Sequence, residues 1–219
     1  MSAKPIAALG ALLVLMLACG ASGQAGKPYD AIEFSRLKGM KGFSDKALDL
    51  HFTLYQGYVK NTNLLRSELQ KMAEQNQTAT PAYAELKRRF GWEFDGMRLH
   101  ELYFGNLGGK DPLSPDSKLM KKIVENFGSF DKWAADFKAT GAMRGIGWVV
   151  LYEDPKTGNL FNTWINEHDV GHLAGCTPLL IMDVWEHAYL SDYGLRRADY
   201  IQAFFDNLDW KAVESRLAK

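Results

Sequence analysis

The first half of the chain has the pattern of two long helices. Between about residues 45 and 75, apolar side chains recur at the three- and four-residue spacing of a helix. These apolar positions are Leu48, Phe52, Tyr55, Val59, Leu64 and Leu65. Ser44 is placed to cap the start of this helix. A polar stretch then ends at Pro81, which favours the start of a second helix that runs to about Asn106.

Two glycines, Gly91 and Gly96, interrupt the pattern of the second helix. Each glycine costs about 1 kcal/mol relative to alanine in a helix interior. A bulky group or a metal site that approaches the helix closely would explain glycine at these two positions.

The second half of the chain has a different pattern, and a loop rich in glycine and proline at residues 108–115 marks the boundary. The predicted elements are helices over 118–126 and 131–142, strands over 147–152, 160–165 and 178–182, and a helix from about Trp185 to the end. The predicted fold class is α+β, with an N-terminal long antiparallel helical hairpin followed by a small three-stranded antiparallel sheet packed with helices. We expect a hairpin domain over residues 27–109 and an α+β metal-binding domain over residues 110–219.

The residues before the first helix have the pattern of an export signal. Lys4 precedes an apolar run over residues 6–18, and small and polar residues follow up to residue 24. The run is shorter than the roughly 20 residues that cross a membrane, so we expect no transmembrane span in the mature chain. Residues 16–20 also resemble a bacterial lipoprotein cleavage box, which makes Cys19 a candidate for lipidation and membrane anchoring. The expected location is the bacterial periplasm, free or as a membrane-anchored lipoprotein.

Composition and charge narrow the classes of function. The chain has 219 residues, and a hydrophobic content of 47% excludes a disordered protein. Its 26 basic and 26 acidic side chains balance, so we expect no nucleic-acid partner, because such binding depends on neutralising phosphates. Only two cysteines are present, which excludes a disulfide framework, and we interpret Cys176 as a buried, unreactive thiol.

Four residues are candidates for a metal site. Asp183 and His187 stand four apart where a buried strand gives way to a helix, and both can face one ion. His51 and His100 lie in the middle of the two long helices, which would bring them together in an antiparallel hairpin. Three histidines and one carboxylate suit iron, manganese or zinc, and spacing alone does not choose among them. The alternative is that Asp183 caps the next helix and His187 is packed in the core.

The C-terminal half resembles a known family. The sequence Pro178–Tyr189 closely resembles the signature of the iron/manganese superoxide dismutase family. The resemblance continues through residues 127–129, 145–148, 196–201 and 209–210, and more loosely through 50–51, 58–59, Asn63 and 99–100. Together these matches span nearly all of the chain that follows the export signal.

The resemblance implies a function and a cofactor. It makes His51, His100, Asp183 and His187 the ligands of one iron (favoured) or manganese ion per subunit. The implied reaction converts superoxide to oxygen and hydrogen peroxide while the metal alternates between the +3 and +2 states. The alternative is a catalytically altered, exported relative with a metal-binding or structural function. A hydrolytic zinc site is a third reading, but it lacks an evident general base.

A tyrosine near the metal is also implied. In the family, a tyrosine eight residues after the first histidine guards the substrate channel, whereas Tyr58 follows His51 by seven. In a regular helix, seven residues return to within about 20° of the starting direction. We therefore expect Tyr58 on the same side as His51, with Tyr55 as the second candidate.

The resemblance assigns His168 as the hydrogen-bond donor to solvent on the metal, a position where many members have glutamine. Iron-type members place this glutamine four residues before the second histidine ligand, where this chain has Gly96. Members with histidine at the position of His168 are largely iron-using, which favours iron. His172 fits this role less well, and we interpret it as a surface or loop histidine.

The remaining assignments concern the walls of the site and the dimer. In the family, the residue at Glu186 reaches a ligand histidine of the partner chain, and Tyr189 lies at the same interface, which implies a homodimer. Trp148 and Trp185 would line the metal pocket. Arg197 matches an arginine near the channel mouth, where it would attract the superoxide anion.

Overall fold

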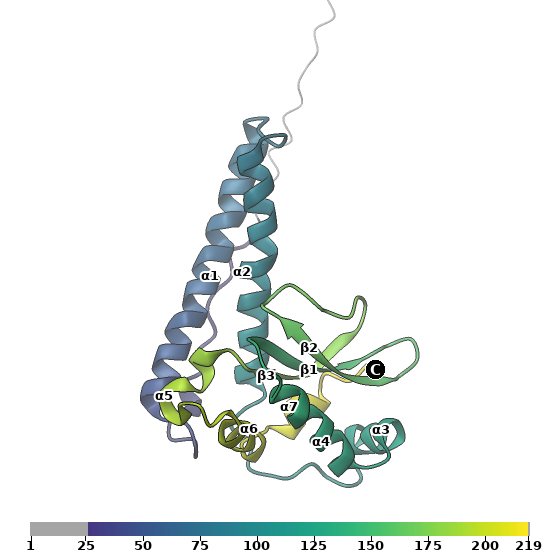
Figure 1. The fold of residues 1–219 in the computed structure, drawn as a ribbon. Coiled ribbons are helices and arrows are strands. Elements are labelled where there is room, and N and C mark those ends of the chain that lie inside the picture. The colour runs from purple at the N-terminus through teal and green to yellow at the C-terminus, as the bar shows by residue number, and fades with distance from the viewer. Residues whose placement is uncertain (1–25, 219) are drawn as a thin grey trace, which may run out of the picture.

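The computed structural model describes residues 26–218 of the chain, and two long antiparallel helices dominate it (Figure 1). These helices are α1 (Asp45–Glu74) and α2 (Pro81–Gly105). The Ser44 hydroxyl accepts a hydrogen bond from the Ala47 amide at 3.0 Å, and Thr80 caps α2 in the same way through Tyr83. The predicted cap Ser44 is confirmed at the start of α1, and α2 begins at Pro81 as expected, with Thr80 as its cap.

The segment before α1 runs along the hairpin and contains a short 3-10 helix, η1 (Ser35–Leu37) (Figure 1). Asn63 of α1 binds this segment through two hydrogen bonds of 2.8 Å with the backbone of Tyr29. The Ile32 amide donates to the Tyr55 hydroxyl at 2.9 Å. These contacts hold the segment before α1 against the hairpin, so Asn63 contributes to the stability of the fold.

The second half forms a three-stranded antiparallel sheet with helices beside it. Its elements are α3 (Lys118–Phe127), α4 (Phe130–Gly141), β1 (Gly147–Glu153), β2 (Leu160–Asn166) and β3 (Thr177–Asp183). The strand order is β2-β1-β3, and every residue of the central strand β1 is buried. Helix α4 packs against β1 and β2, and α2 packs against β3. The predicted α+β class, with a hairpin followed by a three-stranded antiparallel sheet, is confirmed.

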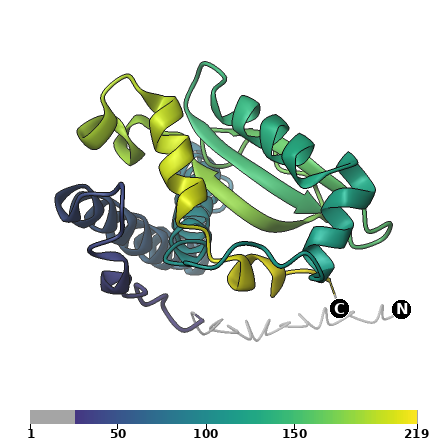
Figure 2. The same cartoon turned by 90° about the horizontal axis from the view of Figure 1, so that it is seen from below.

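The sheet lies to one side of the hairpin when the molecule is viewed along α1 and α2 (Figure 2). One cluster of buried side chains runs from the hairpin through β1 and β3 into the C-terminal helices. The site residues lie where these parts meet. The division of the chain at residues 109 and 110 stays a prediction.

The expected return to helix from about Trp185 is present, but it is not one helix. Four short pieces replace it: η2 (Glu186–Ala188), α5 (Leu190–Tyr193), α6 (Arg197–Asp206) and α7 (Trp210–Glu214). Gly194 has a positive φ of 56°, which ends α5. Leu208 then pairs with Leu107, and Asp209 caps α7 through the Lys211 and Ala212 amides. These breaks depend on tertiary contacts that the apolar spacing does not reveal.

No helix within residues 26–218 is both long enough and apolar enough to cross a membrane. The export signal over residues 1–24 and the lipidation candidate Cys19 lie outside the described residues.

Candidate metal centre

The four predicted ligands meet at one buried point. His51 comes from α1, His100 from α2, Asp183 from the last position of β3, and His187 from η2. The Asp183 Oδ2 atom lies 3.3 Å from His51 Nε2, 3.7 Å from His100 Nε2 and 3.2 Å from His187 Nε2. The four ligand atoms all lie within 4.8 Å of one another.

Local hydrogen bonds orient the side chains of Asp183 and His100. The Trp185 amide donates to Asp183 Oδ1 at 2.8 Å, which turns the other carboxylate oxygen toward the imidazoles. His100 Nδ1 donates to the Gly96 carbonyl at 2.6 Å. Because that carbonyl can only accept, the Nε2 atom of neutral His100 carries a lone pair directed at the centre.

The electrostatics favour the protonation states that bind a cation. Burial lowers the pKa of His51, and it lowers the pKa of His100 well below its ordinary value, with His51 adding to the effect. Burial acts to raise the pKa of Asp183, but the neighbouring imidazoles of His187 and His51 outweigh it and hold the pKa below its usual range. Neutral imidazoles and a charged carboxylate are the forms that coordinate a metal.

The residues present fit an iron or manganese ion. Within residues 26–218, the buried Nε2 atoms of His51 and His100 have no hydrogen-bond partner. Buried polar atoms without a partner are rare in native proteins, and a bound cation would give both lone pairs one. Three nitrogen donors and one carboxylate suit iron and manganese.

Tyr58 stands beside this cluster. Its ring stacks on His100 with 5.1 Å between the ring centroids, and its hydroxyl lies 2.8 Å from His168 Nε2. A Cβ atom added to Gly96 would come within 2.7 Å of the Tyr58 ring, so glycine makes room for it. The Tyr55 hydroxyl instead donates to Glu101 at 3.0 Å. Of the two candidate tyrosines, Tyr58 has its hydroxyl at the site.

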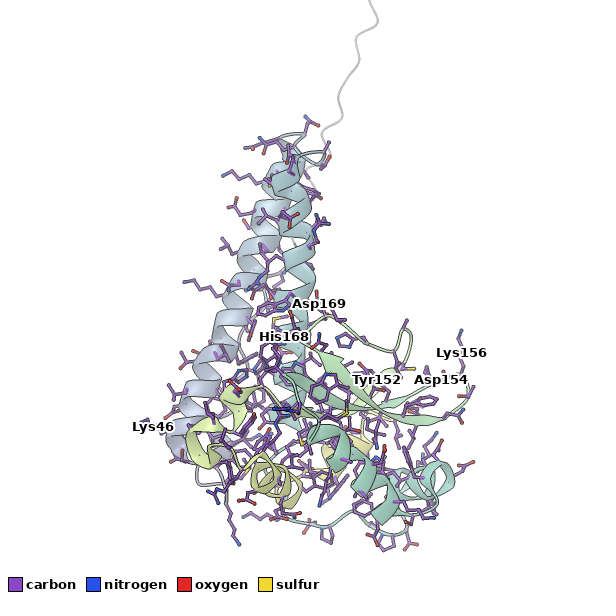
Figure 3. All side chains as sticks on the ribbon, viewed as in Figure 1. Lys46, Tyr152, Asp154, Lys156, His168 and Asp169 are labelled. Atoms are coloured by element: carbon purple, nitrogen blue, oxygen red, sulfur yellow. The ribbon has the colours of Figure 1, made fainter. Side chains whose placement is uncertain are left out.

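His168 is buried in the turn after β2, next to the hairpin (Figure 3). The Trp148 indole donates to its Nδ1 atom at 3.1 Å, and the Trp185 ring stacks on it at 4.8 Å. Burial lowers the pKa of His168 to about 4, which keeps the ring neutral at physiological pH. Trp148 and Trp185 therefore both contact His168.

His172 and Trp92 support the segment that carries His168. His172 is an exposed loop residue that accepts a hydrogen bond from the Tyr152 hydroxyl at 2.7 Å and donates to the His168 carbonyl at 2.8 Å. Trp92 was not predicted as a site residue, yet its ring lies 4.4 Å from His168 and its indole donates to Glu167 at 3.2 Å. Helical spacing gave no signal for Trp92, because a residue eight positions before His100 lies about 80° away from it around α2.

Comparisons with known proteins place the chain in a family. Residues 115–216 match the family model described as iron/manganese superoxide dismutases, C-terminal domain. The "Superoxide dismutase [Fe]" of Cupriavidus metallidurans is 38% identical over 184 residues, covering 82% of this chain and 90% of that protein. The "Superoxide dismutase [Mn] 2" of Haloferax volcanii is 34% identical, covering 86% of this chain and 90% of that protein. The chain belongs to the iron/manganese superoxide dismutase family.

The superoxide dismutase family signature continues into η2 and the short helices after it. Glu186 is exposed, whereas Tyr189 is buried in its own chain against Tyr200, with ring centroids 5.6 Å apart. Beside Glu186 lies a hollow of 640 Å³ with a mostly apolar lining. Its lining residues are Leu50, His51, Leu54, Glu186, His187, Leu190 and Ser191.

Arg197, the expected steering residue, is held in the fold by backbone carbonyls. Its guanidinium donates to the carbonyls of Met143 at 2.6 Å, Gly145 at 2.6 Å and Val184 at 2.8 Å. It also lies over the Tyr189 ring. These bonds tie α6 to the segments around β1 and β3, so the charge of Arg197 can attract an anion only from a distance.

Proposed function

We propose that this protein disproportionates superoxide, so that two superoxide anions and two protons give one molecule of oxygen and one of hydrogen peroxide. The single observation that carries the proposal is that three imidazole nitrogens converge on one carboxylate oxygen in a buried site. Membership of the iron/manganese superoxide dismutase family supports the same reaction.

A bound iron or manganese ion would supply the redox chemistry, taking one electron from a first superoxide and giving it to a second. His51, His100, His187 and Asp183 would hold this ion. The single negative charge of Asp183 stabilises a higher oxidation state of a bound cation more than a lower one. Tyr58 and His168 form a hydrogen-bonded pair beside His100, and we assign them to proton supply and to orientation of the substrate.

Iron is the cofactor that we favour over manganese. The names of similar proteins include both metals, so relatives alone do not choose between them. The support comes from His168, because an imidazole offers fewer hydrogens to the site than the amide of a glutamine. With fewer donors, the residues around a bound ion would stabilise negative charge beside it less, and this would change the potential of the ion.

The proposed function is tested by measuring superoxide decay with protein reloaded with iron, manganese or zinc, and with metal-free protein. We expect fast decay with iron, slower or equal decay with manganese, and no catalysis with zinc, which has no accessible redox change. Superoxide decay with zinc alone would contradict the proposed redox role of an iron or manganese ion. Metal-loaded protein without any dismutation would favour the altered, structural relative.

We also propose a homodimer that joins two copies at η2. Leu50 and Leu190 are 58% and 46% exposed and border the hollow beside Glu186. Exposed apolar side chains around a single charged residue are typical of a subunit interface. A second copy would cover them and would give Glu186, which is exposed beside His187, a partner close to the metal site. The choice between a dimer and a tetramer stays open.

Leu50→Arg is expected to split the homodimer into monomers, because it buries two charges facing each other across a two-fold axis. Sedimentation velocity should give the mass of two chains for the wild type and of one chain for the variant. Leu64→Arg is the matched control, since Leu64 is 54% exposed on the same helix but outside the hollow. A monomeric wild type, or equal dissociation of both variants, would contradict the proposed interface.

We propose that the protein is exported, either to the periplasm or as a lipoprotein anchored at Cys19. The support is the sequence of the first 24 residues, with Lys4, an apolar run and small residues in the order of an export signal. The intact mass of the protein recovered from its own cells distinguishes three forms: uncleaved, cleaved, and cleaved with acyl chains on Cys19. An uncleaved mass would refute export through this signal.

A further inference from the structure

Both ring nitrogens of His168 are engaged by buried aromatic residues. Trp148 Nε1 lies 3.1 Å from His168 Nδ1, and the Tyr58 oxygen lies 2.8 Å from His168 Nε2. Trp148 and His168 are completely buried, and Tyr58 is 8% exposed. Water therefore cannot replace either contact easily, and the chemistry of the three side chains decides where the hydrogens are.

The Trp148 indole fixes the direction of this hydrogen-bond chain. An indole N–H can only donate, so His168 Nδ1 must accept and carries no hydrogen. A neutral imidazole has one ring hydrogen, which must then be on Nε2 and is donated to the Tyr58 oxygen. A doubly protonated ring would turn a second hydrogen toward the indole hydrogen, and the lowered pKa of His168 agrees with its exclusion.

We infer that Trp148 is a positioning residue that selects the Nε2–H tautomer of His168, so that the Tyr58 hydroxyl hydrogen remains free for an anion in the metal site. Among residues 26–218, His168 is the one hydrogen-bond partner of the Tyr58 hydroxyl. Because Tyr58 stacks on the ligand His100, its free hydrogen belongs to the same pocket as the metal ligands. The inference rests on the proposed function in so far as the anion is superoxide.

This tautomer changes the task expected of His168. A glutamine amide has two hydrogens and could serve both a tyrosine and solvent on the metal, whereas His168 has one, and Tyr58 receives it. The donor that faces the open side of the site is then the Tyr58 hydroxyl, and His168 directs it.

The backbone around His168 is held on both sides, which preserves this geometry. Glu167 has a positive φ of 54° and accepts the Trp92 indole hydrogen bond. The His168 carbonyl can only accept, so His172 Nε2 donates to it and neutral His172 Nδ1 accepts from the Tyr152 hydroxyl. The segment therefore presents one orientation of the His168 ring to Trp148 and Tyr58.

The direct test is nitrogen NMR of protein labelled with [15N]histidine and [15N]tryptophan and loaded with diamagnetic Zn(II). We expect a protonated Nε2 and an unprotonated Nδ1 for His168, with a scalar coupling across the hydrogen bond between Nδ1 and the Trp148 indole nitrogen. A hydrogen on Nδ1 of the wild type would overturn the inference. This measurement needs no variant and is independent of turnover.

Two tryptophan variants separate the hydrogen bond from packing. Trp148→Phe removes the indole donor, and we expect the Nδ1–H tautomer to rise from less than about one tenth to a comparable population, since nothing then opposes it. Trp185→Phe is the matched control, because Trp185 stacks on the same ring but within the described residues its indole nitrogen has no partner. The control should keep the Nε2–H form. Unchanged tautomers in Trp148→Phe, or equal changes in both variants, would overturn the assignment to Trp148.

The outcomes also separate this inference from the proposed function. Wild-type protein with the Nε2–H tautomer but no superoxide decay under any metal would remove the proposed function and leave the positioning by Trp148 intact. An active wild type with the hydrogen on Nδ1 would leave the function and remove this inference.

Discussion

Asp183→Asn is expected to reduce the affinity for iron or manganese by at least about 100-fold, and to remove activity with it. The asparagine has the shape of the aspartate, and its oxygen can still accept the hydrogen bond from the Trp185 amide. Its NH2 group then replaces Oδ2, the oxygen on which His51, His100 and His187 converge. The substitution removes both a ligand atom and the negative charge that holds the cation.

Metal content after dialysis and the competition of a chelator for bound iron measure this effect. Asp116→Asn is the matched control, because Asp116 is an exposed carboxylate far from the ligands in sequence. The control should bind one ion per chain like the wild type. Circular dichroism should show that the asparagine variant keeps its helices. Equal metal content in Asp183→Asn and the wild type would contradict the ligand assignment.

Arg216→Ala is expected to lower the free energy of unfolding by about 3–5 kcal/mol. Arg216 is partly buried near the end of the chain and donates to the Leu179 carbonyl of β3 at 2.6 Å and to the Leu102 carbonyl of α2 at 3.2 Å. A further bond reaches the Asn106 side chain. Removal of the guanidinium leaves several acceptors unpaired where the hairpin meets the sheet.

Urea unfolding followed by fluorescence measures this loss of stability. Arg88→Ala is the control, since Arg88 is an exposed residue paired with Glu85 and should change stability by less than about 1 kcal/mol. Superoxide decay per bound metal should be preserved in folded Arg216→Ala, because Arg216 does not contact the ligands. Equal free energies of unfolding for the two arginine variants would show that the hydrogen bonds of Arg216 do not stabilise the fold.

The hairpin could be predicted from sequence because residues close together in the chain determine where each helix forms and begins. Apolar spacing marked the helices, and Ser44 and Pro81 marked their beginnings. The same regularity explains Tyr58, which lies seven residues after His51 in the uninterrupted helix α1. Of the close approaches expected at Gly91 and Gly96, the one at Gly96 is present and is made by the Tyr58 ring, whereas a Cβ at Gly91 would meet nothing within 4 Å.

The convergence of the ligands could not be obtained from spacing alone. His51 and His100 are 49 positions apart, and they reach Asp183 because α1 packs against α2 and α2 packs against β3. The resemblance to a family supplied what local patterns lacked. Trp92 and the carbonyl bonds of Arg197 were missed because they depend on the conformation of loops around residues 143–145 and 167, which carry no periodic signal.

An anomalous difference map recorded at the iron absorption edge, from crystals of iron-loaded protein, tests the metal centre most directly. We predict one strong peak per chain at about 2 Å from the Nε2 atoms of His51, His100 and His187 and from Asp183 Oδ2. A strong peak elsewhere, or a peak from which any of these four side chains is absent, would contradict the metal centre described above.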